Sequence, residues 1–348
     1  MKMTTRLAAA VATTVLLLSA CGVGGDDVAD ADPAGTDTST EETTDDDTTE
    51  VGGDDPDRLV LGLVPSQDMD KLVEDAGVLG DLLSAELGIP VETFVADNYA
   101  GLVVAMQTGQ ADIGMFGPIA LVQAVDEAGA VAVLQSVRRG TDSYHTQWVT
   151  NDPDRFCLDE VVTATNPEGV ELKYCNGTDS AAAGPAGEDA IGLIESGETI
   201  LFVDASSASG YYYPATQVQT VSGLDPFTDI DTQFAGGHPN AILGVSRGDF
   251  EVAVSFDDAR NNVIEEDPNV AENVIVFAWS PEIPNDGVAV GGHLDASLQD
   301  RITTAFLALA DSEEGLTSLD DVYNIEGLVP ANLEALDLAR QVAANFGD

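Results

Sequence analysis

Basic residues are scarce in this sequence. Its 348 residues include 12 lysines and arginines against 62 aspartates and glutamates, so the formal net charge at pH 7 is −50. Fourteen of the acids lie in residues 22–57, which leaves 48 acids and ten bases in residues 58–348. Phosphate contacts need a basic surface, so nucleic acid is not an expected partner. An acidic chain with almost no lysine instead indicates a surface adapted to salt, which screens the repulsion between like charges.

No stretch of the sequence is long and apolar enough to predict a transmembrane helix. The run Leu7–Leu18 is too short to cross a bilayer and has the form of a secretory signal peptide. It ends in Leu18-Ser19-Ala20-Cys21, which resembles the lipobox of bacterial lipoproteins, where the signal is cleaved before a cysteine that is then lipidated. We therefore expect residues 1–20 to be a signal peptide and Cys21 to anchor the protein to the outer face of the cytoplasmic membrane. An ordinary signal peptide with an incidental cysteine is the alternative.

Large apolar side chains are almost missing from residues 22–57. Such a segment cannot bury enough surface to fold, and its like charges extend it. Residues 21–57 are therefore predicted to be the lipidated cysteine followed by an acidic, disordered tether. The remaining residues, about 290, correspond to one large domain or two medium ones.

Cysteine and histidine are too few to predict a metal site. Besides Cys21 the chain has Cys157 and Cys175, and in an exported protein this pair most simply predicts a disulfide. The three histidines lie far apart in the sequence, so neither a metal nor a cofactor is expected.

The region after the tether alternates strand-like and helix-like segments. Short apolar runs closed by proline or glycine predict buried strands, and longer runs with apolar residues at helical spacing predict helices. The predicted strands are residues 58–64, 90–95, 112–116 and 131–137, and the predicted helices are residues 69–87, 101–108 and 119–128. This alternation predicts a mostly parallel, doubly wound α/β sheet, in which ligands lie beyond the carboxyl ends of the strands. The candidates at those ends are Ser66, Tyr99, Gly117 and Pro118.

The alternation stops at residues 141–150 and then resumes. Ser143–Val149 predicts one extended strand that crosses to a second lobe, and the segment between Cys157 and Cys175 predicts a stapled hairpin. The later predicted segments are a helix at 187–195, a strand at 199–203, a helix from about Tyr213, a helix at 240–247, a strand at 251–256, a return crossing at 274–279, and helices at 298–309 and 333–345. We therefore assign residues 58–145 and 275–348 to lobe 1 and residues 146–274 to lobe 2.

A stretch of small residues, Asp204–Pro214, follows the predicted strand at 199–203. It contains three serines and a glycine before three tyrosines and a proline. A strand that passes through small hydroxyl residues into a helix directs free backbone N–H groups and Ser Oγ atoms to one concave spot. With the positive end of the helix dipole behind them, these donors suit an oxyanion. The same residues also fit a serine-rich turn that caps a helix.

Several motifs, in one order, resemble the phosphate-, phosphite- and phosphonate-binding proteins of ABC importers. The motifs are Asn98-Tyr99, Phe116-Gly117-Pro118, Asp204–Pro214, Gly236-Gly237-His238 and Ser280–Gly287. The resemblance covers roughly residues 58–345 and implies a type II periplasmic-binding-protein fold, in which two α/β lobes joined by a two-strand hinge close around one ligand. It also implies an ABC permease and ATPase complex as the partner, and a protein that works as a monomer and is not an enzyme.

The resemblance also implies a set of ligand-binding residues. In that family a Ser-Thr-Ser turn at a helix start holds the oxygens of the ligand. The matching positions here are Ser207, Ala208 and Ser209, followed by Gly210. The middle hydroxyl is missing, so one contact falls to the Ala208 N–H or is lost. His238 matches a family histidine and can donate to an oxyanion, although a lone histidine at a helix start also fits a cap or a surface position.

Two further groups are candidates on the same basis. Asp257 and Asp258 follow the strand predicted at 251–256, and a carboxylate tolerates an anionic ligand only if that ligand has a proton to donate. Asp257 is therefore a predicted selector against sulfate, although both acids also fit a solvated helix start. Tyr99 and Tyr144 are predicted to donate hydroxyl groups from the first lobe and the hinge, where tyrosine otherwise serves for packing.

The sequence thus predicts a lipid-anchored solute-binding protein that delivers phosphonate, phosphite or phosphate to an ABC importer. Which of the three it binds is not fixed by the sequence. Two alternatives stay open. One is a binding protein of the same fold for another small organic solute, such as a sulfonate or an amino acid. The other is an enzyme of the same fold, although neither Gly-x-Ser-x-Gly nor His-Glu-x-x-His occurs in the sequence.

Overall fold

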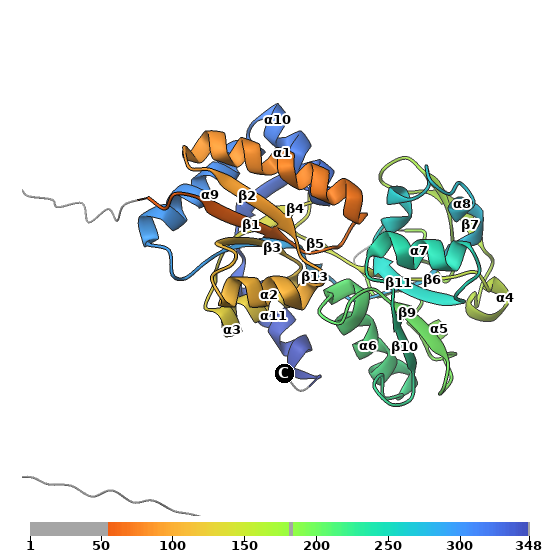
Figure 1. Cartoon of the computed structure of the whole chain (residues 1–348). Helices are drawn as coiled ribbons and strands as arrows, with labels where there is room; N and C mark the ends of the chain where they lie inside the picture. The colour runs from red at the N-terminus through yellow and green to blue at the C-terminus, as the bar shows by residue number, and fades with distance from the viewer. Residues whose placement is uncertain (1–54, 181–183, 347–348) are drawn as a thin grey trace, which may run out of the picture. The chain divides into compact units, whose positions relative to one another are not determined.

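The computed structural model of the protein describes residues 55–180 and 184–346 (Figure 1). The predicted signal peptide, the lipidation at Cys21 and the tether up to residue 54 lie outside the described residues. The described chain forms two α/β lobes, each with its own sheet, and a small two-stranded sheet lies where the chain passes between them. This confirms the predicted arrangement of two α/β lobes joined by a hinge.

The first lobe contains a six-stranded sheet with the order β15-β4-β14-β3-β1-β2. Its strands are β1 (Leu59–Leu63), β2 (Val91–Val95), β3 (Ile113–Phe116), β4 (Val131–Val137), β14 (Gly287–Val290) and β15 (Gly327–Pro330). β1 runs parallel to β2 and β3, whereas β14 runs antiparallel between β3 and β4. The carboxyl ends of β1, β3 and β4 therefore lie at one edge of the sheet, together with the start of β14.

Helices cover both faces of this sheet (Figure 1). They are α1 (Met69–Leu87), α2 (Tyr99–Gln107), α3 (Pro118–Ala128), α9 (Ala296–Ala310), α10 (Glu313–Tyr323) and α11 (Leu333–Ala344). α1 begins where the Asp68 carboxylate accepts the N–H of Lys71, and it ends at Gly88, whose φ of 69° suits glycine. Every fourth or third residue of α1, such as Leu72, Ala76 and Leu79, is buried against the sheet. The bounds of α1 agree with the prediction.

The second lobe contains a seven-stranded sheet with the order β10-β9-β11-β6-β12-β8-β7. Its strands are β6 (Thr146–Thr150), β7 (Val162–Thr165), β8 (Glu171–Tyr174), β9 (Thr199–Phe202), β10 (Asp231–Phe234), β11 (Val252–Phe256) and β12 (Ile275–Trp279). Its helices are α4 (Pro153–Phe156), α5 (Glu188–Ile191), α6 (Tyr213–Gln217), α7 (His238–Ser246) and α8 (Val270–Asn273). Two π-helical segments, η1 (Ala208–Tyr212) and η2 (Val218–Ser222), extend α6 at both ends, and a 3-10 turn, η3 (Ala259–Asn262), follows β11.

The hinge differs from the single strand predicted for Ser143–Val149. The segment splits at His145 into β5 (Ser143–Tyr144) and β6, because β5 pairs with β13 (Ile283–Pro284) in the hinge whereas β6 pairs with β11 and β12 in the second sheet. The predicted strand is therefore divided into two strands that belong to different sheets. β12 also belongs to the second sheet, so the chain returns to the first lobe after Trp279 and not at residue 275 as predicted.

Two other predictions for the second lobe are corrected. The helix expected at 187–195 shrinks to α5, because the helix ends at Gly192 and the chain continues in turns. The helix expected from about Tyr213 begins earlier, at Ala208, so the serine stretch itself forms the first helical turn. The predicted disulfide is confirmed: Cys157 and Cys175 are bonded with their Cα atoms 5.5 Å apart, beside the antiparallel pair of β7 and β8.

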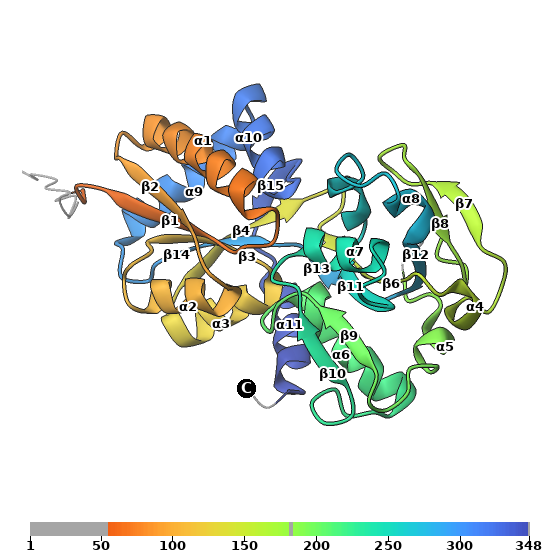
Figure 2. The same cartoon turned by 45° about the vertical axis from the view of Figure 1, so that its right-hand side comes forward.

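The end of the described chain reaches from the first lobe to the second (Figure 2). α11 packs against α3 of the first lobe and also contacts η1. Phe346 follows α11, and its ring lies edge-on to Tyr212, with ring centroids 5.2 Å apart, and to Phe227, at 5.6 Å. The C-terminal segment thus adds an aromatic contact between the lobes besides the hinge.

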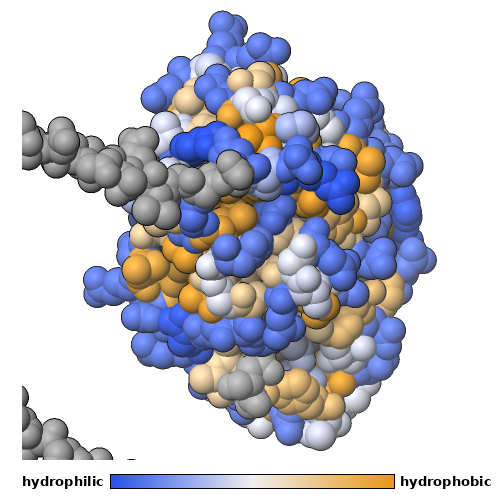
Figure 3. Space-filling view, turned by 60° about the vertical axis from the view of Figure 1, so that its left-hand side comes forward, coloured by the Kyte–Doolittle hydropathy of each residue, from blue (hydrophilic) through white to orange (hydrophobic). Residues whose placement is uncertain are grey.

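Hydrophilic residues cover most of the face of the first lobe seen in Figure 3, and apolar residues form scattered patches between them. This agrees with the acidic composition of the chain. Within residues 55–180 and 184–346, no helix combines the length and the apolar character that crossing a membrane requires.

Candidate ligand-binding site

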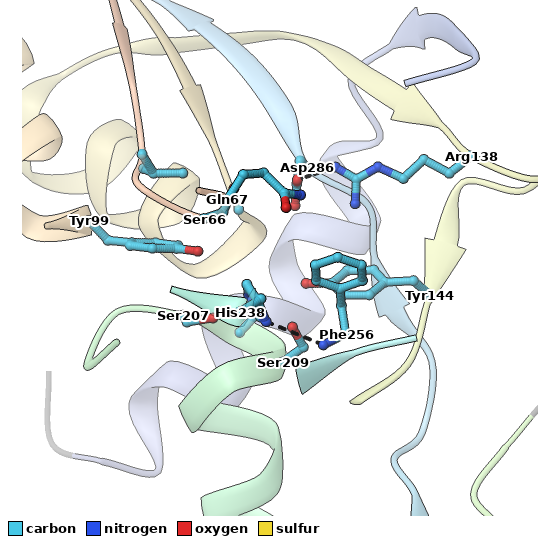
Figure 4. Close-up of a pocket in the computed structure, with 13 residues that line it drawn as sticks. Ser66, Gln67, Tyr99, Arg138, Tyr144, Ser207, Ser209, His238, Phe256 and Asp286 are labelled. Atoms are coloured by element: carbon cyan, nitrogen blue, oxygen red, sulfur yellow. Dashed lines mark hydrogen bonds and ion pairs between the residues drawn. The ribbon is translucent and has the colours of Figure 1, made fainter. Parts of the chain in front are cut away.

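A cavity lies between the two lobes, beside the edge of the first sheet where β1 and β3 end (Figure 4). Its volume is about 20 Å³, a little more than one water molecule needs. First-lobe residues line one side, second-lobe residues line the other, and Tyr144 of β5 completes the wall. The lining residues are Val64, Ser66, Gln67, Tyr99, Gly117, Arg138, Tyr144, Ser207, Ala208, Ser209, His238, Phe256 and Asp286.

Most of the residues predicted to bind a ligand meet at this cavity. Those that line it are Tyr99, Gly117, Tyr144, Ser207, Ala208, Ser209 and His238. Pro118 and Gly210 are the next residues in the chain after lining residues and do not line the cavity themselves. Asp257 lines a second cavity, of about 260 Å³, which shares Arg138, Tyr144 and Phe256 with the first.

The serine stretch supplies backbone donors to the cavity. Ser207 precedes η1, and its Oγ accepts the N–H of Gly210 at 3.0 Å, as an N-cap does. The N–H groups of Ala208 and Ser209 have no acceptor in the described part of the chain, although both residues are almost fully buried. Buried N–H groups without a partner are rare, and the helix dipole favours negative charge at this end. Ala208 has no side-chain hydroxyl, and it thus offers the cavity only its backbone donor.

His238 is a neutral imidazole with a defined tautomer. Burial, followed by the charge of Arg138, lowers the pKa of His238 to about 3. Its Nδ1 accepts the backbone N–H of Phe256 at 3.4 Å and lies 2.8 Å from the Oγ of Ser255. Because a backbone N–H can only donate, Nδ1 carries no hydrogen and Nε2 does. No described residue accepts from Nε2, so this N–H is a donor for a ligand in the cavity.

Tyrosine hydroxyls complete the polar lining. Burial, followed by the charge of Asp204, raises the pKa of Tyr99 well above its ordinary value, and burial likewise raises the pKa of Tyr144. Both hydroxyls therefore keep their hydrogens at neutral pH. Tyr144 interacts with the side chain of Ser209, which places a hinge residue against the serine turn. Behind the cavity the Tyr323 hydroxyl donates to the Val64 carbonyl at 2.7 Å and fixes the end of β1.

An ion pair between Arg138 and Asp286 lies at the first-lobe side of the cavity. Arg138 follows β4 directly, and Asp286 precedes β14, so the two side chains come from neighbouring strands of the sheet. The charge of Asp286 raises the pKa of Arg138, although burial alone would lower it. A Cβ placed on Gly117 would lie 3.6 Å from the Asp286 Oδ1, which is ordinary van der Waals contact, so Gly117 lies directly beside this carboxylate.

Asp257 and Asp258, the two acids after β11, form hydrogen bonds and ion pairs with other residues of the protein. The Asp257 carboxylate accepts from Arg139 at 3.4 Å and from the backbone N–H of His145 at 3.2 Å. Burial raises the pKa of Asp257 despite the positive charge of Arg139. Asp258 forms a buried ion pair with Arg260 at 2.7 Å and accepts from the Tyr174 hydroxyl at 3.2 Å. Asp258 therefore serves the packing of the second lobe.

Hydrogen bonds cross from one lobe to the other around the cavity. The N–H of His238 donates to the Ser66 carbonyl at 3.2 Å, and the N–H of Tyr99 donates to the Asp204 carboxylate at 3.4 Å. The Asn262 side-chain amide donates to the Gln67 side-chain oxygen at 2.6 Å. The structure therefore represents a closed arrangement of the two lobes.

The sequence did not identify some of the lining residues. Arg138 could have been found, because it stands at the carboxyl end of a correctly predicted strand, where the same rule had pointed to Ser66 and Gly117. Asp286 lies within the motif Ser280–Gly287 that contributed to the resemblance, but it was given no role, because the strand that positions it, β14, was not predicted. Phe256 ends a predicted strand and lines the cavity only because β11 lies beside the start of η1.

A small polar cavity enclosed between two hinged lobes defines a substrate-binding protein of the kind that closes around its ligand. Residues 61–336 match the family described as the periplasmic substrate-binding protein of phosphonate ABC transporters, and the chain belongs to this family. These are transport proteins and not enzymes, as predicted. Membership implies a small ligand, an ABC permease and ATPase as partners, and a location outside the cytoplasm.

Two curated relatives support this assignment. The phosphate-import protein PhnD of Mycolicibacterium smegmatis is 24% identical over 278 residues, which cover 76% of this chain and 77% of that protein. The phosphonates-binding periplasmic protein of Escherichia coli is 22% identical over 234 residues, which cover 67% of this chain and 60% of that protein.

Solved structures show the same fold. PhnD1 of Prochlorococcus marinus in complex with methylphosphonate has a TM-score of 0.67 and 17% identity, and the match covers 84% of this chain and 99% of that one. The binding protein of an ABC phosphonate transporter from Pseudomonas aeruginosa has a TM-score of 0.66 and 20% identity, with 83% and 86% covered. The predicted type II periplasmic-binding-protein fold is thereby confirmed.

Proposed function

We propose that this protein captures a phosphorus oxyanion, either phosphonate, phosphite or phosphate, outside the cytoplasm and delivers it to an ABC importer. The observation that carries the proposal is the pair of buried N–H groups of Ala208 and Ser209 without an acceptor among the described residues, next to the Nε2–H of His238. These three donors meet at one cavity, and backbone donors at a helix start suit the oxygens of an anion.

The acidity of the chain does not conflict with this function. The cavity is lined by fixed dipoles, and its ionised pair, Arg138 with Asp286, adds no net charge. Short hydrogen bonds inside a closed cavity act in a low dielectric, whereas salt screens the acids on the surface. Local donors therefore outweigh the distant negative charge.

Delivery follows from the closure of the lobes. The donors to the ligand lie mainly on the second lobe, and Ser66, Gln67 and Tyr99 face them from the first. A ligand that contacts both sides stabilises the closed arrangement, and a permease that recognises this arrangement receives loaded protein in preference to empty protein. In this proposal the protein acts as a monomer.

Lipidation of Cys21 holds the protein at the outer face of the cytoplasmic membrane in this proposal. The support is the sequence alone: an apolar run of signal-peptide form that ends in Leu18-Ser19-Ala20-Cys21. Mass spectrometry of the mature N-terminus tests it. We expect an acylated Cys21 and release of a Cys21→Ser variant into the medium, and an unmodified N-terminus elsewhere in the chain would refute the anchor.

The binding function is tested by calorimetric titration of the full chain, stripped of ligand and held in high salt. Phosphate, phosphite, methylphosphonate, aminoethylphosphonate and sulfate are compared. We expect tight binding of at least one phosphorus oxyanion and no heat with sulfate. If all five give no heat, the fold stands and the oxyanion proposal is wrong.

A further inference from the structure

The ligand cavity contains one carboxylate among its described lining residues, that of Asp286. It points toward the guanidinium of Arg138, with which it forms an ion pair, and both side chains are largely buried, at 18% and 12% exposure (Figure 4). Asp286 lies on the first-lobe side, and the donors of Ala208, Ser209 and His238 lie on the second-lobe side. A ligand between the lobes therefore meets an acceptor on one side and donors on the other.

The position of this carboxylate is fixed by the sheet. The Asp286 carbonyl accepts the N–H of Ser136 at 2.8 Å, and the next residue, Gly287, pairs with Phe116 of β3 and Gln135 of β4. Arg138 is held by a pair of backbone hydrogen bonds with Thr141, each 3.0 Å long. Both partners are thus held by backbone hydrogen bonds on the first-lobe side of the cavity.

We propose that Asp286, ion-paired with Arg138, selects oxyanions that carry a proton. The inference rests on the proposed function and deepens it. An anion bound to the second-lobe donors presents its remaining oxygens to Asp286, and two anionic oxygens repel each other unless a hydrogen lies between them. Arg138 stays protonated under all ordinary conditions, so it does not give up a proton to Asp286 or to the anion. The hydrogen between Asp286 and the anion must therefore come from the ligand. A fully deprotonated anion is rejected.

The other titratable groups near Asp286 do not supply that hydrogen. Tyr99, Tyr144 and Tyr323 face it from α2, β5 and α10, and burial raises the pKa of each, so they remain neutral hydroxyls. His238, across the cavity, is neutral at all but acidic pH. Burial also raises the pKa of two carboxyls that act on Tyr99 and Arg138, those of Asp204 and Asp257, but neither residue lines this cavity. The tyrosines and His238 therefore do not change charge near neutral pH, and the ligand is the group expected to exchange a proton in the cavity.

The three anion types respond to pH in different ways. Sulfate has no proton at neutral pH. Methylphosphonate loses its last proton near neutral pH, as a phosphate monoester does at about pH 6. Inorganic phosphate still carries one proton after that ionisation. A carboxylate that demands a proton therefore accepts phosphate at both acidic and basic pH, accepts methylphosphonate only on the acidic side, and excludes sulfate throughout.

The test is calorimetric titration of the full chain with these three anions at about pH 6 and about pH 9. For wild-type protein we expect methylphosphonate affinity to fall at least about tenfold at the higher pH, because one pH unit beyond an ionisation leaves about a tenth of the anion protonated. Phosphate affinity should change far less and serves as the internal control. Equal methylphosphonate affinity at both pH values overturns the inference without reference to any variant.

Variants identify the selecting residue. Asp286→Asn replaces the carboxylate by an amide that can donate to a ligand, and we expect it to bind sulfate and to lose the pH dependence for methylphosphonate. Asp126→Asn removes the same formal charge from a surface pair with Arg340, outside the cavity, and should match wild type. If Asp257→Asn relaxes the exclusion of sulfate and Asp286→Asn does not, the selector is Asp257 and the inference is wrong.

The two proposals fail in different ways. If wild-type protein binds none of the three anions at either pH, the proposed function fails and this inference falls with it. If it binds phosphate or methylphosphonate but Asp286→Asn still excludes sulfate, the function stands and the inference alone is overturned. Should Asp286→Asn not fold, the pH comparison on wild-type protein decides.

Discussion

The side-chain amide of Asn262 donates to the side-chain oxygen of Gln67 across the two lobes, at 2.6 Å. Gln67 lies just after β1 and lines the ligand cavity, whereas Asn262 lies at the end of η3 in the second lobe. The bond therefore exists only when the lobes are closed, and it connects the closed state to a residue of the site.

Asn262→Ala should shift the lobes toward the open state. A hydrogen bond of this kind contributes about 0.5–1.5 kcal/mol, so we expect oxyanion affinity to fall about two- to tenfold, with the thermal stability of ligand-free protein nearly unchanged. Calorimetry measures the affinity, and small-angle scattering measures the opening. Asn240→Ala is the matched control, because Asn240 donates to Ala235 within the second lobe. An equal loss of affinity in the control would show that the bond to Gln67 has no special role.

Ala208→Pro tests the backbone donor of the serine turn. Ala208 is the first residue of η1, and Ser207 before it has φ −81° and ψ 132°, which proline accepts in its predecessor. The change removes the unpaired N–H and keeps an allowed conformation for Ser207. We expect loss of a hydrogen bond to an anion, worth about 1.5–3 kcal/mol, so that affinity falls about ten- to a hundredfold.

The matched control for this change is Ala296→Pro. Ala296 begins α9, far from the cavity in the sequence, and Asp295 before it has φ −67° and ψ 154°. This variant should bind like wild type and unfold at a similar temperature. Unaltered binding by Ala208→Pro would mean that the ligand does not use this N–H.

Local sequence patterns predicted most of the first lobe and much of the cavity. The apolar runs of β1, β3 and β4 are short and closed by proline or glycine, so their carboxyl ends could be located and Ser66 and Gly117 identified as candidates. The serine turn was identified because it combines a preceding strand with small hydroxyl residues. These features depend on neighbours in the chain, which a sequence displays directly.

The remainder depends on contacts between distant segments. β14 is a four-residue strand inserted antiparallel between β3 and β4, and this pairing brings Asp286 to Arg138, 148 residues earlier in the chain. Asp257 was correctly placed at the end of a strand, but its carboxylate points to Arg139 and His145 and not into the first cavity. The direction of a side chain after a strand depends on the partners that tertiary packing provides, and a single sequence does not show them.

Removal of the disulfide should destabilise the second lobe. Cys157 and Cys175 are 18 residues apart and hold α4 beside the end of β8. We expect the double change Cys157→Ser with Cys175→Ser to lower the free energy of unfolding by about 2–4 kcal/mol. Denaturant titration of both proteins without reductant measures this. Wild-type protein in strong reductant should move toward the variant, whereas the variant itself should not respond to reductant; a variant as stable as wild type would show that the bond does not limit unfolding.

The buried pair of Asp258 and Arg260 should make stability depend on acid pH. Their side chains are 3% and 0% exposed, and Arg260 also donates to the carbonyls of Lys173 and Val274. Burial opposes ionisation of Asp258, but the charge and hydrogen bonds of Arg260 outweigh it and lower the pKa of Asp258 below its ordinary value of 3.8. An acid with a lowered pKa stabilises the fold fully above its unfolded-state pKa, and this contribution is lost as pH falls through the folded-state value.

Asp258→Asn should therefore act on both the size and the pH dependence of stability. At neutral pH the variant leaves a buried guanidinium without its counter-charge, and we expect a loss of about 3–5 kcal/mol in the free energy of unfolding. Below pH 3.8 the difference from wild type should shrink, because Asp258 of the unfolded wild-type chain takes up a proton first and Asp258 of the folded chain does so at still lower pH. Denaturant unfolding across the acid range measures both effects, and Asp126→Asn, which breaks a surface pair, should cost less than about 1 kcal/mol. A constant difference between wild type and Asp258→Asn down to the lowest pH would show that Asp258 does not titrate in this range.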